Sequence, residues 1–331
     1  MKIGVIGLGY WGPNLLRNLF HFPDVQPVGC DSDIKRIDVM KKVFPNAEYN
    51  DDYKILLKDD NLKAVVIATP VSTHFEIAKE FLLSGKDVFV EKPLTKSSKE
   101  AEELIEIAEK EKRVLMVGHT FMFNPAVLKI KEFIKNGDIG ELYYITSTRV
   151  NLGIHRKDAS VIWDLAPHDL SMIFTWMDAD PVHINGVGKE SIIKGLPDVA
   201  FLQIIFDNGV IADIQVGWLS PSKIRKTIIV GSKKMIEYDD TDPQEKVKVF
   251  DSGVDVQETY DYGEYLLQYR TGDIYSPKIP GSEPLKLEME HFINCIKKRE
   301  KPISDGKIGL KIVKILEQAE SSIKKANGSL I

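Results

Sequence analysis

The feature that most constrains the fold of this sequence is a glycine-rich turn directly after its first apolar run. The letters KIGVI (2–6) predict a short buried strand, GLGYWG follows, and PNLLRNLF then has a helical pattern. The turn places Gly7, Gly9 and Gly12 in the spacing G-x-G-x-x-G, and Asp31 ends the next predicted strand. A strand, such a turn, a helix and a later acidic residue together predict a dinucleotide-binding α/β unit.

Each glycine has a physical task in that prediction. Gly7 permits the tight turn, Gly9 lets the backbone approach a pyrophosphate, and Gly12 lets the helix pack on the strand. The helix N-terminus offers backbone N–H groups to phosphates, with Tyr10 and Trp11 beside them as further cofactor-binding candidates. Asp31 can accept hydrogen bonds from ribose hydroxyls and would repel a 2′-phosphate. We therefore expect NAD rather than NADP, although Lys35 and Arg36 follow closely and would soften that preference.

Predicted strands and helices alternate through the first 120 residues, and the strands are continuously apolar. This pattern predicts a doubly wound parallel sheet of the Rossmann type, buried on both faces, over residues 1–120. Longer alternating runs with hairpin signals such as DNG follow, so residues 121–331 are predicted to form an α+β domain with a large, mainly antiparallel open sheet. An amphipathic helix at about 305–326 is expected to dock back on the first domain.

Composition excludes several classes of protein. The chain has 331 residues and a formal net charge of −5, without the concentrated basic face that nucleic-acid binding requires. We see no apolar run of the length that a membrane helix needs and no signal peptide. Cys30 and Cys295 lie far apart, without metal-like spacing, which favours a reducing cytoplasm and argues against a disulfide framework.

Two further stretches place polar groups at the ends of predicted strands, where open α/β sheets bind ligands. In ATPVSTH, Thr69 and Pro70 are expected to line the cofactor, with His74 as a further candidate or as a packed, capping histidine. In VFVEKPLT, Glu91 and Lys92 follow a buried run. A lysine there can hold positive charge where an alkoxide develops.

The stretch VIWDLAPHDLSMI (161–173) carries Asp164 and His168 in an apolar neighbourhood, with Asp169 beside them. Residues four apart share a helix face, so the carboxylate can orient the imidazole and raise its basicity. One interpretation is a base that accepts a hydroxyl proton. The alternative is a buried Asp–His pair that serves only structure.

The stretches GVIGLGYWG, ATPVSTH, VEKPLT and WDLAPHDLS, in this order, resemble the Gfo/Idh/MocA family of nicotinamide-dependent sugar oxidoreductases across essentially the whole chain. RVNLG (149–153), the segment 217–240 and the segment 285–310 are similar to its UDP-N-acetylglucosamine 3-dehydrogenase branch. The resemblance implies that Lys92 and His168 face the substrate carbon beside the nicotinamide, with Asp164 behind the imidazole. It does not say which of the two is the principal base.

The resemblance implies oxidation of the C3 hydroxyl of a UDP-N-acetylhexosamine. Alternatives within the family are a free sugar, inositol or a keto-sugar reduced in the opposite direction, and a non-catalytic NAD-binding sensor is the alternative from another class. Where many relatives carry an arginine, this chain reads HTFMFNP. We therefore expect substrate contacts from His119, Asn124, Arg149, Asn151, His155 and Arg156. Apolar residues on the outer face of the second sheet predict a homodimer or homotetramer.

Overall fold

The computed structural model describes residues 1–331 except 154, 156–158, 259–264 and 329–331. The chain divides into two compact units, which we describe separately. Unit 1 comprises Met1–Phe123 and Ser282–Lys314, and unit 2 comprises Asn124–Gly281 and Ile315–Ile331. The sequence-based division at residue 120 assigns everything beyond it to the second domain, whereas Ser282–Lys314 return to unit 1.

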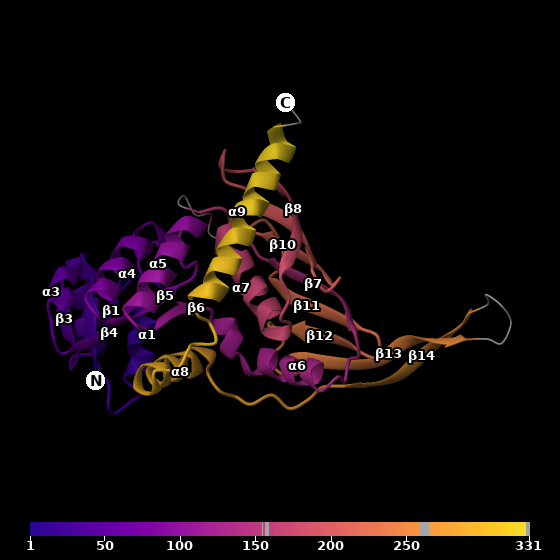
Figure 1. Ribbon diagram of the computed structural model, residues 1–331, viewed down its shortest axis with the longest axis horizontal. Helices are drawn as coiled ribbons and strands as arrows, with labels where there is room; N and C mark the ends of the chain where they lie inside the picture. The colour runs from indigo at the N-terminus through magenta and orange to yellow at the C-terminus, as the bar shows by residue number, and fades with distance from the viewer. Residues whose placement is uncertain (154, 156–158, 259–264, 329–331) are drawn as a thin grey trace. The chain divides into compact units, whose positions relative to one another are not determined.

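Unit 1 is built on a parallel sheet of six strands in the order β3-β2-β1-β4-β5-β6. Its strands are β1 (Lys2–Ile6), β2 (Gln26–Cys30), β3 (Glu48–Asn50), β4 (Leu62–Ile67), β5 (Asp87–Glu91) and β6 (Leu115–Gly118), and Figure 1 labels all of them except β2. Its helices are α1 (Gly12–Leu19), α2 (Ile34–Val43), α3 (Tyr53–Leu57), α4 (His74–Leu83), α5 (Ser98–Lys110) and α8 (Pro284–Lys298), with 3₁₀ turns η1 (Val71–Thr73) and η2 (Thr120–Phe123). This is the predicted doubly wound Rossmann sheet.

Both faces of that sheet are buried because successive side chains of each strand enter different apolar clusters. Ala64 and Val66 of β4 pack with residues of α1 and α8, whereas Val65 and Ile67 pack with residues of α4 and α5. The continuous apolar strands of the sequence are explained by this two-sided burial.

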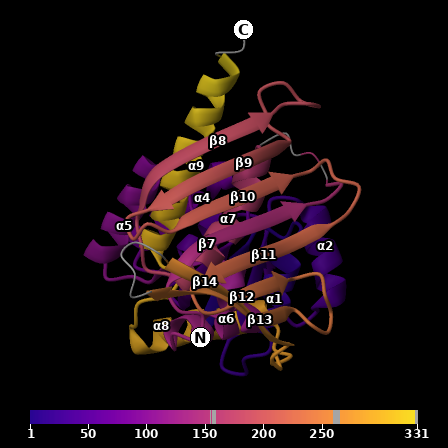
Figure 2. The same cartoon turned by 90° about the vertical axis from the view of Figure 1, so that its right-hand side faces the viewer.

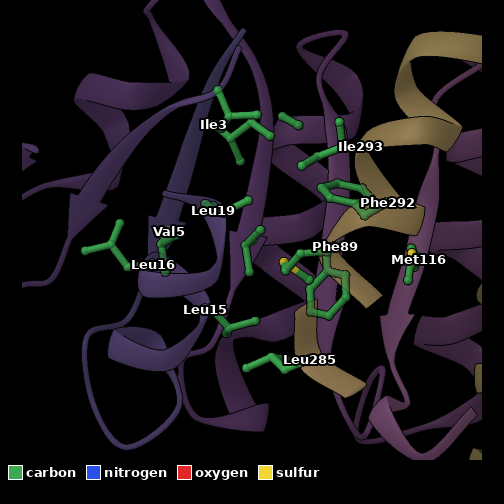
Figure 3. Close-up of a cluster of buried hydrophobic side chains, with 14 of the residues drawn as sticks. Ile3, Val5, Leu15, Leu16, Leu19, Phe89, Met116, Leu285, Phe292 and Ile293 are labelled. Atoms are coloured by element: carbon green, nitrogen blue, oxygen red, sulfur yellow. The ribbon is translucent and has the colours of Figure 1, made fainter. Parts of the chain in front are cut away.

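Helix α8 reaches this core from late in the chain. Leu285, Met289, Phe292 and Ile293 recur at helical spacing and are all buried against the sheet. The rings of Phe292 and Phe89 of β5 lie 5.6 Å apart, edge to face, and Figure 3 shows Phe292 and Ile293 beside that strand residue. A helix that follows Asn124–Gly281 of unit 2 in the chain therefore completes the hydrophobic core of unit 1.

Unit 2 contains an eight-stranded sheet in the order β14-β13-β12-β11-β7-β10-β9-β8, which Figure 2 shows nearly face-on. The β7–β10 pair is parallel and the other neighbours are antiparallel. The strands are β7 (Leu142–Val150), β8 (Pro181–Lys189), β9 (Val199–Phe206), β10 (Ile211–Gly217), β11 (Ile224–Gly231), β12 (Met235–Asp239), β13 (Val247–Glu258) and β14 (Tyr265–Tyr275). The predicted large, mainly antiparallel sheet is confirmed.

Helices α6 (Pro125–Lys135) and α7 (Val161–Trp176) belong to unit 2 and pack on each other through Trp176, whose indole N–H donates to the Val127 carbonyl at 3.0 Å. Helix α9 (Gly306–Gly328) belongs to unit 1 as far as Lys314 and to unit 2 from Ile315 onward. Gly186 of β8 lies against Ala319 and Ile323 of this second part. Of the helices in the described part of the chain, none has the length and hydropathy to cross a membrane.

Candidate functional site

The glycine-rich turn between β1 and α1 has the geometry its spacing predicts. Gly7 adopts φ +93°, and a Cβ there would lie 2.7 Å from the Ala68 carbonyl oxygen. A Cβ on Gly12 would lie 2.0 Å from the Gly7 carbonyl oxygen. A Cβ on Gly9, in contrast, would meet only the Arg36 guanidinium, at 3.6 Å or more, within the described residues. Gly7 and Gly12 are thus required by the turn itself, and Gly9 leaves its backbone open to a ligand.

The N-terminus of α1 is suited to an anion. Trp11 stands at its N-cap without a side-chain hydrogen bond to the helix, and the described first turn holds no acidic residue. The helix dipole therefore favours a negatively charged group at this end. Tyr10 is 85 % exposed and Trp11 is 40 % exposed, and their rings meet edge to face at 5.6 Å. Both residues lie within the glycine turn, between Gly9 and Gly12.

Asp31 lies at the carboxyl end of β2 with its side chain fixed against the turn. Its Oδ2 accepts hydrogen bonds from the Leu8 N–H at 2.7 Å and the Arg36 guanidinium at 3.2 Å, while Oδ1 accepts from the Asp33 N–H at 2.9 Å. Asp31 is 6 % exposed, whereas the Arg36 side chain is about half exposed. The acidic residue expected near the ribose is therefore next to Arg36, one of the two basic residues expected to soften a preference for NAD.

His74 connects two strand-end loops of unit 1. It is buried, with Nδ1 at 2.9 Å from the Pro93 carbonyl oxygen and Nε2 at 2.9 Å from the Thr69 carbonyl oxygen. Burial lowers the pKa of His74. Both ring nitrogens contact backbone, so the structure favours the packed, capping alternative over a direct cofactor contact. Thr69 is held further by the Thr73 hydroxyl at 2.7 Å, and Pro70 immediately precedes η1.

Glu91 ends β5 and Lys92 follows it at the carboxyl edge of the sheet. Glu91 is buried, and the Lys92 backbone N–H lies 3.3 Å from its Oε2. Burial raises the pKa of Glu91 to about 7, against the opposing charge of Lys92. Lys92 is partly buried. The predicted lysine is thus placed at the same sheet edge as the glycine turn, with a buried carboxyl beside it.

His119 directly follows β6 in the chain. It is 1 % exposed, and neither ring nitrogen has a hydrogen-bond partner among the described residues. Burial, and then the charge of Lys92, lower the pKa of His119 to about 3, so the ring is neutral. We expected His119 to contact substrate, but the structure encloses it in unit 1.

Asp164 and His168 both lie on α7, in unit 2, and both are partly buried. Their i, i+4 spacing places them on one helix face, as predicted. Pro167 lies between them inside the helix and cannot donate a backbone hydrogen bond to the preceding turn.

Arg149 and Asp169 form a buried ion pair behind that face. The Arg149 Nε lies 2.8 Å from the Asp169 Oδ2, and its Nη2 lies 3.1 Å from Oδ1. The Ser147 hydroxyl also donates to Asp169 at 2.8 Å. The side chains of Arg149 and Asp169 are 5 % and 1 % exposed. We expected Arg149 to contact substrate, whereas the structure uses its guanidinium to hold α7 on β7.

Other expected substrate residues of unit 2 have neighbours within that unit. Asn124 caps α6 through the Ala126 N–H at 2.9 Å and donates to the Tyr238 hydroxyl at 3.3 Å. The Asn151 backbone N–H donates to the Gly217 carbonyl. The His155 ring packs against Trp218 at 5.5 Å. Arg156 lies outside the described residues.

Sequence reasoning gave Asp169 no role and did not consider Glu288, which is fully buried on α8. A charged residue inside the apolar face LKLEMEHFI was the available signal for Glu288. Its neighbours could not be identified without the structure.

Comparison with known proteins agrees with this arrangement. Residues 1–119 match the Gfo/Idh/MocA oxidoreductase family model, described as an NAD-binding Rossmann fold, and residues 127–237 match the Gfo/Idh/MocA C-terminal domain. UDP-N-acetylglucosamine 3-dehydrogenase of Acidithiobacillus ferrooxidans is 25 % identical, over 98 % of this chain and 97 % of its own. Myo-inositol 2-dehydrogenase of Thermotoga maritima is 27 % identical over the same shares.

A solved structure of the Acidithiobacillus ferrooxidans enzyme superposes with a TM-score of 0.80 at 23 % identity, covering 98 % of each chain. That likeness establishes the fold of both units. The two family models, the glycine turn that carries the NAD-binding signature and the strand-end lysine together make this chain a member of the Gfo/Idh/MocA family, an oxidoreductase that acts on CH–OH groups.

Proposed function

We propose that this protein oxidises the C3 hydroxyl of a UDP-linked N-acetylhexosamine and uses NAD as hydride acceptor. The observation that carries the substrate proposal is the similarity to UDP-N-acetylglucosamine 3-dehydrogenase along 98 % of the chain. Inositol dehydrogenases have similar identity. Inositol is therefore the alternative substrate. A UDP-linked sugar requires the protein to bind a nucleotide, whereas inositol does not.

The residues of the glycine turn fit a nicotinamide dinucleotide. The backbone at Gly9 is open where a Cβ would otherwise stand, and the N-terminus of α1 favours phosphates. The Asp31 carboxylate is fixed by two backbone N–H groups and can accept ribose hydroxyls. When bound, NAD supplies the carbon that accepts the hydride.

Lys92 and His168 are proposed to manage the proton of the substrate hydroxyl. His168 accepts the proton as the alcohol becomes a carbonyl, because a neutral imidazole is a suitable base near neutral pH. Asp164, one turn earlier on α7, orients the ring. The Lys92 ammonium stabilises the negative charge that develops on the oxygen.

The substrate is tested with purified protein, NAD and matched compounds at one pH. We expect NADH formation with UDP-N-acetylglucosamine and none with free N-acetylglucosamine, myo-inositol or scyllo-inositol. Turnover restricted to the inositols or to free sugars would refute the nucleotide-sugar proposal and favour the alternative. No turnover with any compound, while NAD binds, would favour the non-catalytic sensor.

The preference for NAD is proposed to depend on Asp31. Replacing Asp31 with serine removes the charge that repels a 2′-phosphate and leaves Arg36 available to bind it. We expect the ratio of NADP to NAD affinity to rise about tenfold or more, equivalent to about 1.4 kcal/mol. The measurement is titration calorimetry with both cofactors. The double variant D31S/R36A is the control, because it should lose the gain for NADP, and an unchanged ratio in D31S would contradict the proposed role.

We also propose that the outer face of the unit 2 sheet mediates self-association. On that face, Val187 pairs with Phe201, and Ile205 pairs with Ile211 beside Tyr144. All five side chains are exposed by 39 % or more. Such a contiguous apolar strip is typical of an interface. Light scattering should show a dimer or tetramer for the wild type and a smaller species for F201E/I211E, and an unchanged mass in that variant would exclude this face.

A further inference from the structure

Two carboxyl groups from distant parts of the chain meet the same short segment at the end of β6. Glu91 of β5 lies against Gly118, where a Cβ would be 3.1 Å from the Glu91 Oε2. Glu288 of α8 accepts a hydrogen bond from the Thr120 hydroxyl at 2.8 Å through its Oε2. Glu91 is 8 % exposed and Glu288 is fully buried. All these residues belong to unit 1.

Two further ionisable residues are neighbours of this cluster along the chain. Lys92 follows Glu91 directly, and His119 lies between Gly118 and Thr120. The His119 ring is neutral, as described above. The cluster therefore carries one positive charge, from Lys92, and up to two negative charges.

Two ionised carboxylates in one buried site repel each other, so such pairs usually retain one proton between them. With a single positive charge nearby, one carboxylate balances the cluster and a second would leave an uncompensated buried charge. Burial and the nearby charge of Glu91 raise the pKa of Glu288 well above its ordinary value.

The surroundings of the two groups differ in a way that identifies the protonated one. Glu91 interacts with the Lys92 charge and lies near a backbone N–H, both of which favour a carboxylate. Glu288 accepts one neutral hydroxyl, and its Oε1 has no hydrogen-bond partner among the described residues. The proton should therefore reside mainly on Glu288.

We propose that Glu288 is a buried neutral carboxylic acid that shares its site with Glu91, so that the negative charge beside Lys92 belongs to Glu91. That single charge stabilises the Lys92 ammonium, the form that the proposed function requires. The importance of this state for turnover rests on the proposed function, but the protonation state itself does not.

Infrared spectroscopy tests the protonation state directly, because a protonated carboxylic acid has a carbonyl stretch separate from that of a carboxylate. We expect the wild-type protein at pH 7 to show this band and E288Q to weaken it to the part that Glu91 contributes, because burial raises the pKa of Glu91 to about 7. Glu290→Gln is the matched control, since Glu290 is exposed on the same helix. A wild-type band that E288Q leaves unchanged would overturn the proposal.

The charge beside Lys92 is tested by reductive methylation followed by mass spectrometry of the Lys92 peptide across pH. In E288Q the Glu91 carboxylate remains, so the pKa of Lys92 should stay near the wild-type value. In E91Q/E288Q both carboxylates are lost, and we expect Lys92 to react about tenfold faster near neutral pH, which equals one unit of pKa. Exposed Lys96 serves as the internal reference.

Two results would refute the proposal that the negative charge beside Lys92 belongs to Glu91. One is equal Lys92 reactivity in E288Q and E91Q/E288Q, and the other is an equally large change in E288Q alone. Circular dichroism establishes that each glutamine variant is folded. Failure of the protein to oxidise any sugar would leave the infrared band and the reactivity of Lys92 unaffected, so the two proposals can fail independently.

Discussion

Replacing Lys92 with alanine is expected to lower kcat by about 100- to 10,000-fold, the range associated with removal of a positioned acid–base group or of a group that stabilises an oxyanion. Lys92 stands at the carboxyl edge of the unit 1 sheet, and its backbone N–H lies beside the buried Glu91 carboxyl. The glycine turn and Asp31 are left intact, so NAD affinity should change by a few-fold at most. Steady-state kinetics with the substrate found in the assays above and cofactor calorimetry check both parts.

His168→Ala should lower kcat by a similar factor, and Asp164→Asn by less, because Asp164 acts through the imidazole. The loss in His168→Ala should be larger at neutral to alkaline pH than at low pH in the oxidation direction, because only a neutral imidazole can accept the hydroxyl proton. Lys96→Ala is the control, since Lys96 is exposed and four residues further along the chain. Full activity in both the Lys92 and His168 variants would show that neither group performs the chemistry.

The Rossmann sheet could be predicted because its determinants are local. The apolar runs of β1, β4 and β5, the glycine turn and the helix patterns between them each specify one element, and right-handed parallel crossovers order them. Small elements escaped prediction: β3 has three residues and α3 has five. Each of these elements contains too few apolar residues to show the periodicity of a strand or a helix.

The remaining features of the fold and the site depend on contacts between residues far apart in the sequence, which local patterns do not predict. Helix α8 is amphipathic, but its sequence does not say that its apolar face belongs to unit 1, from which Asn124–Gly281 of unit 2 separate it along the chain. The same gap separates Glu288 from Thr120, so the buried carboxyl pair could not be inferred. In unit 2, β14 (Tyr265–Tyr275) was missed because polar residues interrupt its apolar ones, namely Gln268, Arg270, Thr271 and Asp273.

The motif WDLAPHDLS illustrates how local spacing can be correct and still incomplete. Asp164 and His168 share a helix face as predicted. Asp169, the residue next to the imidazole, points elsewhere and is buried with Arg149, 20 residues earlier on β7. Adjacent residues on a helix differ by about 100° in direction, so one motif serves both a proposed chemical face and a structural contact.

Replacing Asp169 with alanine is expected to destabilise the protein by about 3–5 kcal/mol, because breaking a buried ion pair leaves the other charge without compensation. Arg149 donates from both Nε and Nη2 to this carboxylate, and its own side chain is 5 % exposed. The Ser147 hydroxyl loses its acceptor as well. Urea denaturation at pH 7 gives the free energy of unfolding.

Two variants separate this effect from a general loss of charge. Glu132→Ala removes an exposed ion pair with Lys129, and it should cost about 1 kcal/mol or less because solvent screens such pairs. R149M/D169L removes both buried charges and should recover much of the stability lost in Asp169→Ala. If it recovers stability but lowers kcat, the ion pair serves to place α7, and with it Asp164 and His168, rather than to hold the fold together. A cost below about 1 kcal/mol for Asp169→Ala would instead mean that water reaches Arg149, contrary to its burial here.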